Sequence, residues 1–134
     1  MNRRTFVEKS AVALAATTAV TTTAEASKPS KMAFIHHVFF WLKNPSNAQE
    51  SAKFEKALND LAQIDVIRMV HVGKPIVTEF DKGVTDGSYA YSVVLVFDNA
   101  KDEETYLYHP LHKKFIDENK HLFAKVMVYD SLAS

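Results

Sequence analysis

The segment Phe34-Ile35-His36-His37-Val38-Phe39-Phe40-Trp41-Leu42 is a continuous apolar and aromatic run that ends just before Asn44-Pro45. It is too short for a typical helix and its residue types favour strands, which predicts a buried strand. Side chains alternate between the two faces of a strand. One face carries His37, Phe39 and Trp41, and the other carries His36, Val38, Phe40 and Leu42. We expect helices to cover the face that carries His37, and His36 to point the opposite way.

The chain after this strand divides into helical and extended patterns. Phe54, Leu58 and Leu61 recur at spacings of four and three, which is typical of an amphipathic helix. The predicted elements are a helix over residues 48–63, strands over 66–76 and 89–97, a short helix over 99–108, a second helical segment from Pro110, and a last strand over 123–129. The order β-α-β-β-α-β predicts an α+β, ferredoxin-like fold, in which helices cover one face of an antiparallel sheet.

Both faces of the predicted sheet are apolar, although helices can cover only one of them. A second copy of the chain, packed sheet to sheet, would bury the other face, since an exposed patch this apolar usually marks an interface. We therefore expect a symmetric homodimer.

The first residues have the pattern of an export signal. Arg3-Arg4, a pair typical of twin-arginine signals, precedes a mild apolar stretch, and Ala24-Glu25-Ala26 resembles a small-residue cleavage site. The apolar stretch is too short to cross a bilayer, so we expect no membrane association after cleavage. The alternative is a disordered tail. We predict a signal over residues 1–26, a flexible lead-in over 27–32, one domain over 33–134, and a periplasmic location.

Composition excludes several classes of function. The chain has no cysteine, so no disulfide, thiolate metal site or lipid-anchoring cysteine is possible. Lys plus Arg number 16 and Asp plus Glu number 16, and the basic residues form no cluster interleaved with aromatics. This pattern lacks the electrostatic signature of a nucleic-acid binder, so we expect no nucleic-acid partner.

Candidate chemistry lies in Tyr106-Leu107-Tyr108-His109-Pro110-Leu111-His112. An imidazole can accept or donate a proton at neutral pH, and a phenol can stabilise a developing oxyanion, so His112 with Tyr106 could enolise a carbonyl compound. Pro110 interrupts the helical register between them. The structural alternative is that His109 caps the kink by a backbone hydrogen bond and His112 fills a polar notch at the start of the helix. For His109 we favour the structural role.

These features together resemble a known family, the stress-responsive A/B barrel (Dabb) domain proteins. The resemblance covers nearly all of residues 33–134. It implies a ferredoxin-like fold whose dimer forms a central β-barrel, with a cavity between the helices and the sheet of each subunit. The matching segments are Ile35-His36-His37-Val38-Phe39-Phe40, Gly73, the strand over 89–97, Tyr106-x-x-His109-Pro110-x-His112 and Val128-Tyr129-Asp130.

The resemblance also implies residues for that cavity. In a plant relative, olivetolic acid cyclase, which closes a linear polyketide without a cofactor, the acid/base histidine falls on His112, a tyrosine on Tyr106 and a strand histidine on His37. Another pocket histidine of that enzyme falls at about Tyr91, which argues against the same substrate. These aromatic residues could instead form the core of a small domain. The expected pocket lining is Phe39, Trp41, Phe54, Leu58, Tyr91, Val93, His109 and Phe115.

We expect neither a metal nor an organic cofactor. His37, His109 and His112 could offer nitrogen ligands, but no HExxH motif or carboxylate-bearing equivalent accompanies them.

Three functions remain open from the sequence. The first is an exported homodimer that binds a small, partly apolar carbonyl or phenolic compound and performs cofactor-independent acid/base chemistry of the cyclase or lyase type with His112, Tyr106 and His37. The second is a non-catalytic, stress-related structural dimer whose histidines only stabilise the fold. The third is a cofactor-free monooxygenase that oxidises an electron-rich aromatic compound in the same cavity.

Overall fold

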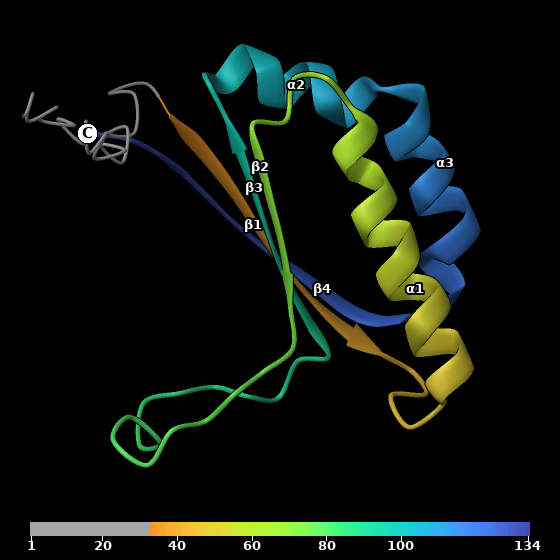
Figure 1. Ribbon diagram of the computed structural model, residues 1–134, viewed down its shortest axis with the longest axis vertical. Coiled ribbons are helices and arrows are strands. Elements are labelled where there is room, and N and C mark those ends of the chain that lie inside the picture. Colours follow the sequence, from red (N-terminus) through yellow and green to blue (C-terminus); the bar gives the residue numbers. More distant parts are fainter. Residues whose placement is uncertain (1–32) are drawn as a thin grey trace, which may run out of the picture.

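The computed structural model describes residues 33–134, which form one antiparallel sheet with helices on one face (Figure 1). The strands lie in the order β2-β3-β1-β4. This arrangement confirms the predicted α+β, ferredoxin-like fold. The predicted export signal and lead-in lie outside the described residues. The elements are β1 (Phe34–Leu42), α1 (Ala48–Asp60), the 3₁₀ turn η1 (Leu61–Gln63), β2 (Met69–Gly73), β3 (Tyr91–Phe97), α2 (Ala100–Tyr108), α3 (Pro110–Asn119), the 3₁₀ turn η2 (Lys120–Leu122) and β4 (Phe123–Leu132).

Local capping explains where the first two helices begin. The side-chain oxygen of Asn47 accepts hydrogen bonds from the backbone N–H groups of Gln49 and Glu50, at 3.2 and 3.1 Å. Asn99 does the same for the N–H of Asp102, at 2.9 Å. These bonds satisfy donors that a helix start would otherwise leave unpaired. Both helices therefore begin close to the predicted positions.

Three strands differ in length from their predictions. β3 begins at Tyr91, two residues after the start of the predicted strand over 89–97. β2 is shorter than the predicted strand over residues 66–76, since it ends at Gly73 and Pro75 has no N–H to donate to a ladder. β4 is longer than predicted because its ladder with β1 continues to the pair Phe34↔Leu132. Within the described part of the chain, every helix is too short or too polar to span a bilayer.

The helices cover the face of β1 opposite to the expected one. His36, Val38, Phe40 and Leu42 are buried, whereas His37, Phe39 and Trp41 are half-buried on the uncovered face. The prediction that His37 lies under the helices is therefore wrong. Alternation along the strand defines the two sets, but both sets are apolar, so alternation alone does not say which set the helices cover.

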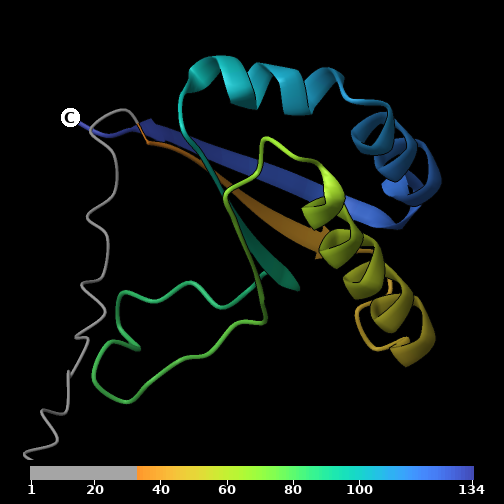
Figure 2. The ribbon, with the colours of Figure 1, turned by 45° about the horizontal axis from the view of Figure 1, so that its top comes forward.

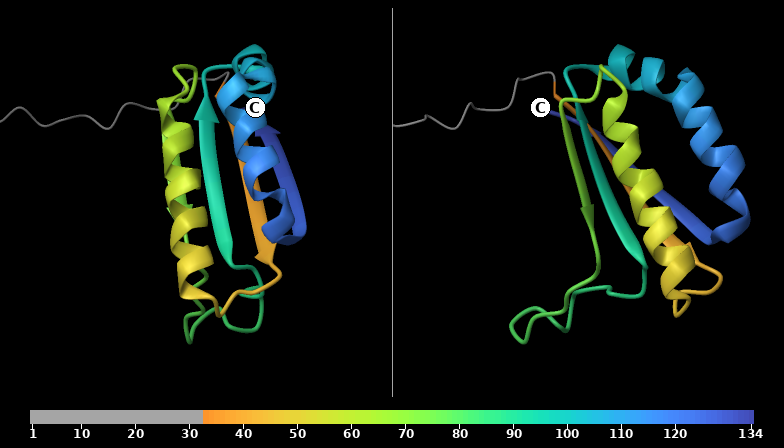
Figure 3. Two further views of the ribbon diagram at one scale, coloured as in Figure 1. Left: turned by 90° about the vertical axis from the view of Figure 1, so that its right-hand side faces the viewer. Right: turned by 45° about the vertical axis from the view of Figure 1, so that its right-hand side comes forward.

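The core between helices and sheet is built around aromatic rings. Phe54 of α1 is fully buried, and its ring centroid lies 5.2 Å from that of Phe40 in β1 and 5.9 Å from that of Phe115 in α3. Burying a side chain of this size stabilises the fold by about 1.5–3 kcal/mol relative to leaving it exposed. These contacts hold α1 and α3 side by side over the sheet, as Figure 3 shows.

The opposite face of the sheet carries no helix within the described residues (Figure 1). Aromatic side chains gather there, with the Phe39 ring centroid 4.9 Å from that of Tyr89 and 6.0 Å from that of Tyr129. The connection over residues 74–90 extends beyond the end of the sheet, away from the helices (Figure 2), and leaves Phe80 fully exposed. An apolar surface of this kind is typical of an interface.

Candidate functional site

A cavity of about 190 Å³ lies between the helices and the covered face of the sheet. Its walls are mostly apolar, and three of its side chains can take part in proton transfer, namely His36, Tyr106 and His112. The other lining residues are Val38, Phe40, Leu58, Leu61, Val93, Leu95, Leu107, Phe115, Ile116, Phe123, Val126 and Val128.

Tyr106 lies between the two histidines of the cavity. Its ring centroid is 4.4 Å from that of His112 and 5.8 Å from that of His36. The three residues come from α2, α3 and β1, so the fold brings together one side chain from each of three elements. The structure thus brings Tyr106 and His112 together, despite the break in helical register at Pro110.

His112 is held in one tautomer by the backbone. Its Nδ1 lies 3.0 Å from the carbonyl oxygen of Leu107, and since a carbonyl only accepts, Nδ1 carries the proton and donates it. Nε2 is then left as a hydrogen-bond acceptor. Burial lowers the pKa of His112, and the neighbouring His36 lowers it further, against the opposing effect of the Leu107 hydrogen bond. His112 is therefore a neutral proton acceptor at pH 7.

Tyr106 is a protonated phenol in the cavity wall. Its side chain is buried, and burial raises its pKa, with the carboxylate of Glu103 raising it further. Burial and Glu103 are the causes of that pKa shift, and no hydrogen bond from another described residue to the hydroxyl contributes to it. A hydroxyl that stays protonated and unpaired in an apolar cavity can donate to an oxygen of a bound molecule.

His36 is oriented by two carboxylates outside the cavity lining. Its Nδ1 lies 2.7 Å from Oδ1 of Asp130 in β4 and 3.6 Å from Oε1 of Glu103 in α2. Burial raises the pKa of Glu103, while the nearby His36 lowers it. In the neutral ring, with Nδ1 donating to Asp130, Nε2 on the other edge is an acceptor.

Sequence reasoning missed His36, Glu103 and Asp130 as site residues. Glu103 is one of the acidic residues in the first turn of α2, and Asp130 entered only through the C-terminal segment of the family resemblance. The signal that could have found the pair is register, because His36 and Asp130 are direct partners in the β1–β4 ladder and so share a face.

The structure places some of the predicted lining residues at the cavity and others elsewhere. Leu58, Val93 and Phe115 line the cavity, as predicted. Phe54 and Tyr91 belong to the packed core instead, as the structural alternative held. The hydroxyl of Tyr91 is directed to α1, where it donates to the carbonyl oxygen of Ser51 and to Oε2 of Glu55, both at 3.1 Å.

The residues of the uncovered face and the helix break do not line the cavity. His37 Nε2 lies 2.8 Å from Ser92 Oγ, its ring packs 4.2 Å from that of Phe39, and burial together with His71 lowers its pKa. Trp41 Nε1 donates to Ser88 Oγ at 3.0 Å. His109 caps α3, because its Nδ1 accepts a hydrogen bond from the backbone N–H of Leu111 at 3.1 Å. The structural role favoured for His109 is therefore confirmed.

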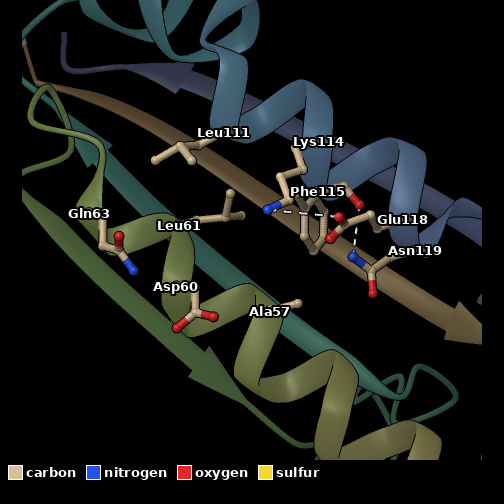
Figure 4. A pocket seen from close by; sticks show the side chains of 9 residues that line it. All are labelled: Ala57, Asp60, Leu61, Gln63, Leu111, Lys114, Phe115, Glu118 and Asn119. Carbon is tan, nitrogen blue, oxygen red and sulfur yellow. Dashed lines mark hydrogen bonds and ion pairs between the residues drawn. The ribbon is translucent and has the colours of Figure 1, made fainter.

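A second hollow of about 210 Å³ lies between α1 and α3 (Figure 4). Its polar groups are engaged locally: Lys114 Nζ lies 3.8 Å from Oε1 of Glu118, and Asn119 Nδ2 donates to the carbonyl oxygen of Phe115 at 2.8 Å. The Lys114–Glu118 pair is exposed. The arrangement in this hollow offers no adjacent proton donor and acceptor comparable with Tyr106 and His112.

The chain matches a known protein family. The model of the Stress Responsive A/B Barrel Domain (Dabb) matches residues 34–133. The chain belongs to this family. Among curated protein sequences, none matches the chain.

Solved structures share the fold at low sequence identity. A Dabb family protein from Mesorhizobium loti is 22% identical, with a TM-score of 0.62, over 75% of this chain and 95% of that one. A dimeric ferredoxin-like protein from Thermobifida fusca is 20% identical, with a TM-score of 0.62, over 75% and 91%. The hydroxynitrile lyase of Passiflora edulis is 17% identical, with a TM-score of 0.65, over 80% and 96%. At these identities, the similarity establishes the fold of this Dabb protein.

Proposed function

We propose that this Dabb protein binds a small, partly apolar carbonyl or phenolic compound in the 190 Å³ cavity and catalyses cofactor-independent proton transfer on it. The observation that carries the proposal is the packing of the Tyr106 ring between His112 and His36, at centroid distances of 4.4 and 5.8 Å, in an otherwise apolar wall. A proton donor next to a proton acceptor, both buried, is the arrangement that general acid/base catalysis requires.

The size and lining of the cavity define the class of ligand. Ligand sites for drug-sized molecules measure roughly 300–1,000 Å³, so a cavity of about 190 Å³ suits a smaller compound. Its apolar wall favours an aromatic or aliphatic body, and the hydroxyl of Tyr106 favours an oxygen atom as the polar end. The long linear polyketide of the plant cyclase does not match this description.

In the proposed reaction, Tyr106 donates a hydrogen bond from its hydroxyl to the carbonyl oxygen of the bound compound. His112 Nε2 removes a proton from the adjacent carbon, and the electron pair of the broken C–H bond moves to the oxygen, giving an enolate. The Tyr106 hydrogen bond stabilises that negative charge where it develops. Attack of the enolate on a second carbonyl would give aldol chemistry, and return of the proton would give simple exchange.

His36 takes the place that sequence reasoning assigned to His37. Because Asp130 holds Nδ1, the free Nε2 can accept a hydrogen bond from a ligand hydroxyl or assist a second proton transfer. The fold also occurs in a hydroxynitrile lyase, which shows that such a scaffold accommodates lyase chemistry. The proposal itself depends on the residues of this cavity.

Deuterium exchange tests the proposal directly. The probe is 4-hydroxyacetophenone, which has one carbonyl and one phenol, incubated with the full chain in D₂O and followed by the loss of the methyl proton signal in ¹H NMR. We expect catalysed exchange that His112→Ala abolishes while the free energy of unfolding stays close to that of the wild type. Binding without exchange would favour a non-catalytic protein. Oxygen uptake with a quinol would instead favour the monooxygenase.

We further propose that the protein is a homodimer through the uncovered face of the sheet. The support is the half-buried aromatic surface around Phe39. In addition, two structural neighbours, from Bacteroides fragilis and Thermobifida fusca, are dimeric proteins. Light scattering should give twice the mass of one chain, and Phe39→Asp should give a folded monomer. A monomeric wild type at micromolar concentration would contradict this proposal.

We also propose export to the periplasm, which is supported by the sequence pattern of Arg3-Arg4, the apolar stretch and Ala24-Glu25-Ala26. A fusion of residues 1–31 to a reporter that is active only after export should be exported. Replacing both arginines by lysine should block that export. Export of the doubly substituted fusion would contradict the twin-arginine assignment.

A further inference from the structure

We propose that His36, Glu103 and Asp130 form a binding site for one divalent transition-metal ion of the Zn²⁺ type. Each residue offers one ligand atom, and these atoms all lie within 4.8 Å of one another. His36 comes from β1, Glu103 from α2 and Asp130 from β4, so the tertiary fold alone assembles the cluster. The site lies beside the cavity, on the Nδ1 edge of the His36 ring.

The distances are close to those of a coordinated ion. Zn²⁺ binds histidine nitrogen and carboxylate oxygen at about 2.0–2.2 Å, so two ligands of a tetrahedral site lie roughly 3.3–3.6 Å apart. His36 Nδ1 and Glu103 Oε1 are already 3.6 Å apart. The Nδ1–Oδ1 distance to Asp130, now 2.7 Å, must open by roughly 0.6–0.9 Å as the ion replaces the proton between them. Three protein ligands would leave a fourth position for water.

Glu103 is the independent observation that points to a ligand. Its side chain is only 12% exposed, and its one ion-pair partner among the described residues is His36, whose Nδ1 lies 3.6 Å from Oε1, which is longer than a normal hydrogen bond. Buried carboxylates are almost always paired, because leaving water costs a charge several kcal/mol. The only basic side chain that pairs with it in the described chain is His36, which Asp130 already engages. A divalent cation would balance both carboxylates at once.

The chemistry of the donor set favours a transition metal over Mg²⁺ or Ca²⁺. Imidazole nitrogen suits Zn²⁺, Fe²⁺ and Ni²⁺, whereas Mg²⁺ and Ca²⁺ prefer oxygen ligands only. The side chain of Asp130 is 41% exposed, so an ion can reach its carboxylate from solvent. The histidines considered from the sequence, His37, His109 and His112, are not grouped in this way.

Metal binding would change the state of His36 in the cavity. Without metal, Nδ1 donates to Asp130 and Nε2 is an acceptor; with metal on Nδ1, the proton of the neutral ring moves to Nε2, which becomes a donor. The ion would therefore convert the His36 edge of the cavity from proton acceptor to proton donor. This consequence rests on the proposed function, whereas the metal site does not.

Cobalt binding to the full chain tests the site. Co²⁺ should give a visible absorption spectrum that saturates at one ion per chain and that Zn²⁺ displaces. His36→Ala and Asp130→Asn should each weaken Co²⁺ binding by more than the 10- to 100-fold typical of lost outer-shell partners. His121→Ala and Glu118→Gln are matched controls, because both side chains are exposed and lie outside the cluster, and they should bind like the wild type.

Two results would overturn the site. The first is no saturable Co²⁺ spectrum in folded protein, and the second is a spectrum that His36→Ala and Asp130→Asn leave unchanged. Glu103→Gln, which removes the charge and keeps the shape, provides a further variant, and circular dichroism checks that each variant is folded. ¹⁵N NMR of the histidines supplies a readout apart from activity: a His36 ring that keeps its proton on Nδ1 with Zn²⁺ present would show the Asp130 hydrogen bond in place of a metal site.

Discussion

His36 and Asp130 are direct cross-strand partners in the ladder of β1 and β4, and their side chains meet on the helix-covered face with Nδ1 2.7 Å from Oδ1. They are 94 residues apart in the sequence. The pair orients the one histidine of β1 that reaches the cavity. The acid/base groups of the proposed site therefore depend on strand register as much as on the helical Tyr-His segment.

The first prediction concerns the Tyr106 hydroxyl. Tyr106→Phe should reduce proton exchange on the carbonyl probe by about 10²-fold or more, which is the range of a lost general acid or oxyanion donor. The free energy of unfolding should change by less than about 1 kcal/mol, because no intramolecular hydrogen bond is lost. Rate by NMR and stability by urea denaturation provide the two readouts. Tyr108→Phe is the control, since Tyr108 is 68% exposed; equal loss in both variants would contradict the role.

The second prediction concerns pH and His112. Burial lowers its pKa in the folded state, while the unfolded residue titrates near its ordinary value of about 6.5. The unfolded chain therefore takes up the proton first as pH falls. The stability contributed by neutral His112 is present above pH of about 6.5 and is lost as pH falls through the folded pKa.

Urea denaturation between pH 7.5 and 5 checks this linkage. The wild type should lose more stability over that interval than His112→Asn, which has no imidazole to protonate. Both proteins share the pH dependence of the other residues, including His37. Identical slopes for the two proteins would show that His112 is not held neutral.

The third prediction separates the two histidines of the Tyr-His segment. His109→Ala removes the cap on α3 and should destabilise the protein by about 0.5–2 kcal/mol. His109→Asn should restore the cap, because asparagine is a good capping residue. Both variants should retain full exchange activity on the carbonyl probe. Loss of exchange in a His109 variant of unchanged stability would place His109 in the site after all.

The fourth prediction concerns alkaline stability and Tyr91. Burial, followed by the neighbouring Glu55, raises the pKa of Tyr91 to about 12. The unfolded residue titrates near pH of about 10, so the unfolded chain loses its proton first. Stability from protonated Tyr91 is therefore present below pH of about 10 and is lost as pH rises towards 12.

Alkaline denaturation of Tyr91→Phe checks this assignment. The variant should be less stable than the wild type at pH 7, by about 0.5–1.5 kcal/mol for the lost hydrogen bonding, and should show a smaller further loss between pH 10 and 12. Tyr108→Phe should follow the wild type throughout. A Tyr91→Phe curve parallel to that of the wild type would mean that Tyr91 ionises as it does in the unfolded chain.

The order and type of the elements could be predicted from the sequence because each depends on neighbouring residues. β1 was predicted with its observed bounds, Phe34–Leu42, and α2 and α3 meet at the predicted break before Pro110. Periodicity, capping residues and a proline act over one or two helical turns, so they can be read without the tertiary structure. Tyr106 and His112 could be predicted as candidate site residues for the same reason, because they lie close together in the sequence.

Only the tertiary structure decided which face of β1 the helices cover. The sets His37-Phe39-Trp41 and His36-Val38-Phe40 are both apolar, so hydrophobicity gives each nearly the same preference for burial. The choice depends on register: Val38 and Phe40 pair with Val93 and Tyr91, and that face of β3 packs against the helices. The same register brings Asp130 to His36. Local sequence therefore predicts only the helical residues of the site, Tyr106 and His112. The strand residues His36 and Asp130 come together through strand pairing between positions far apart in the chain, which only the tertiary structure shows.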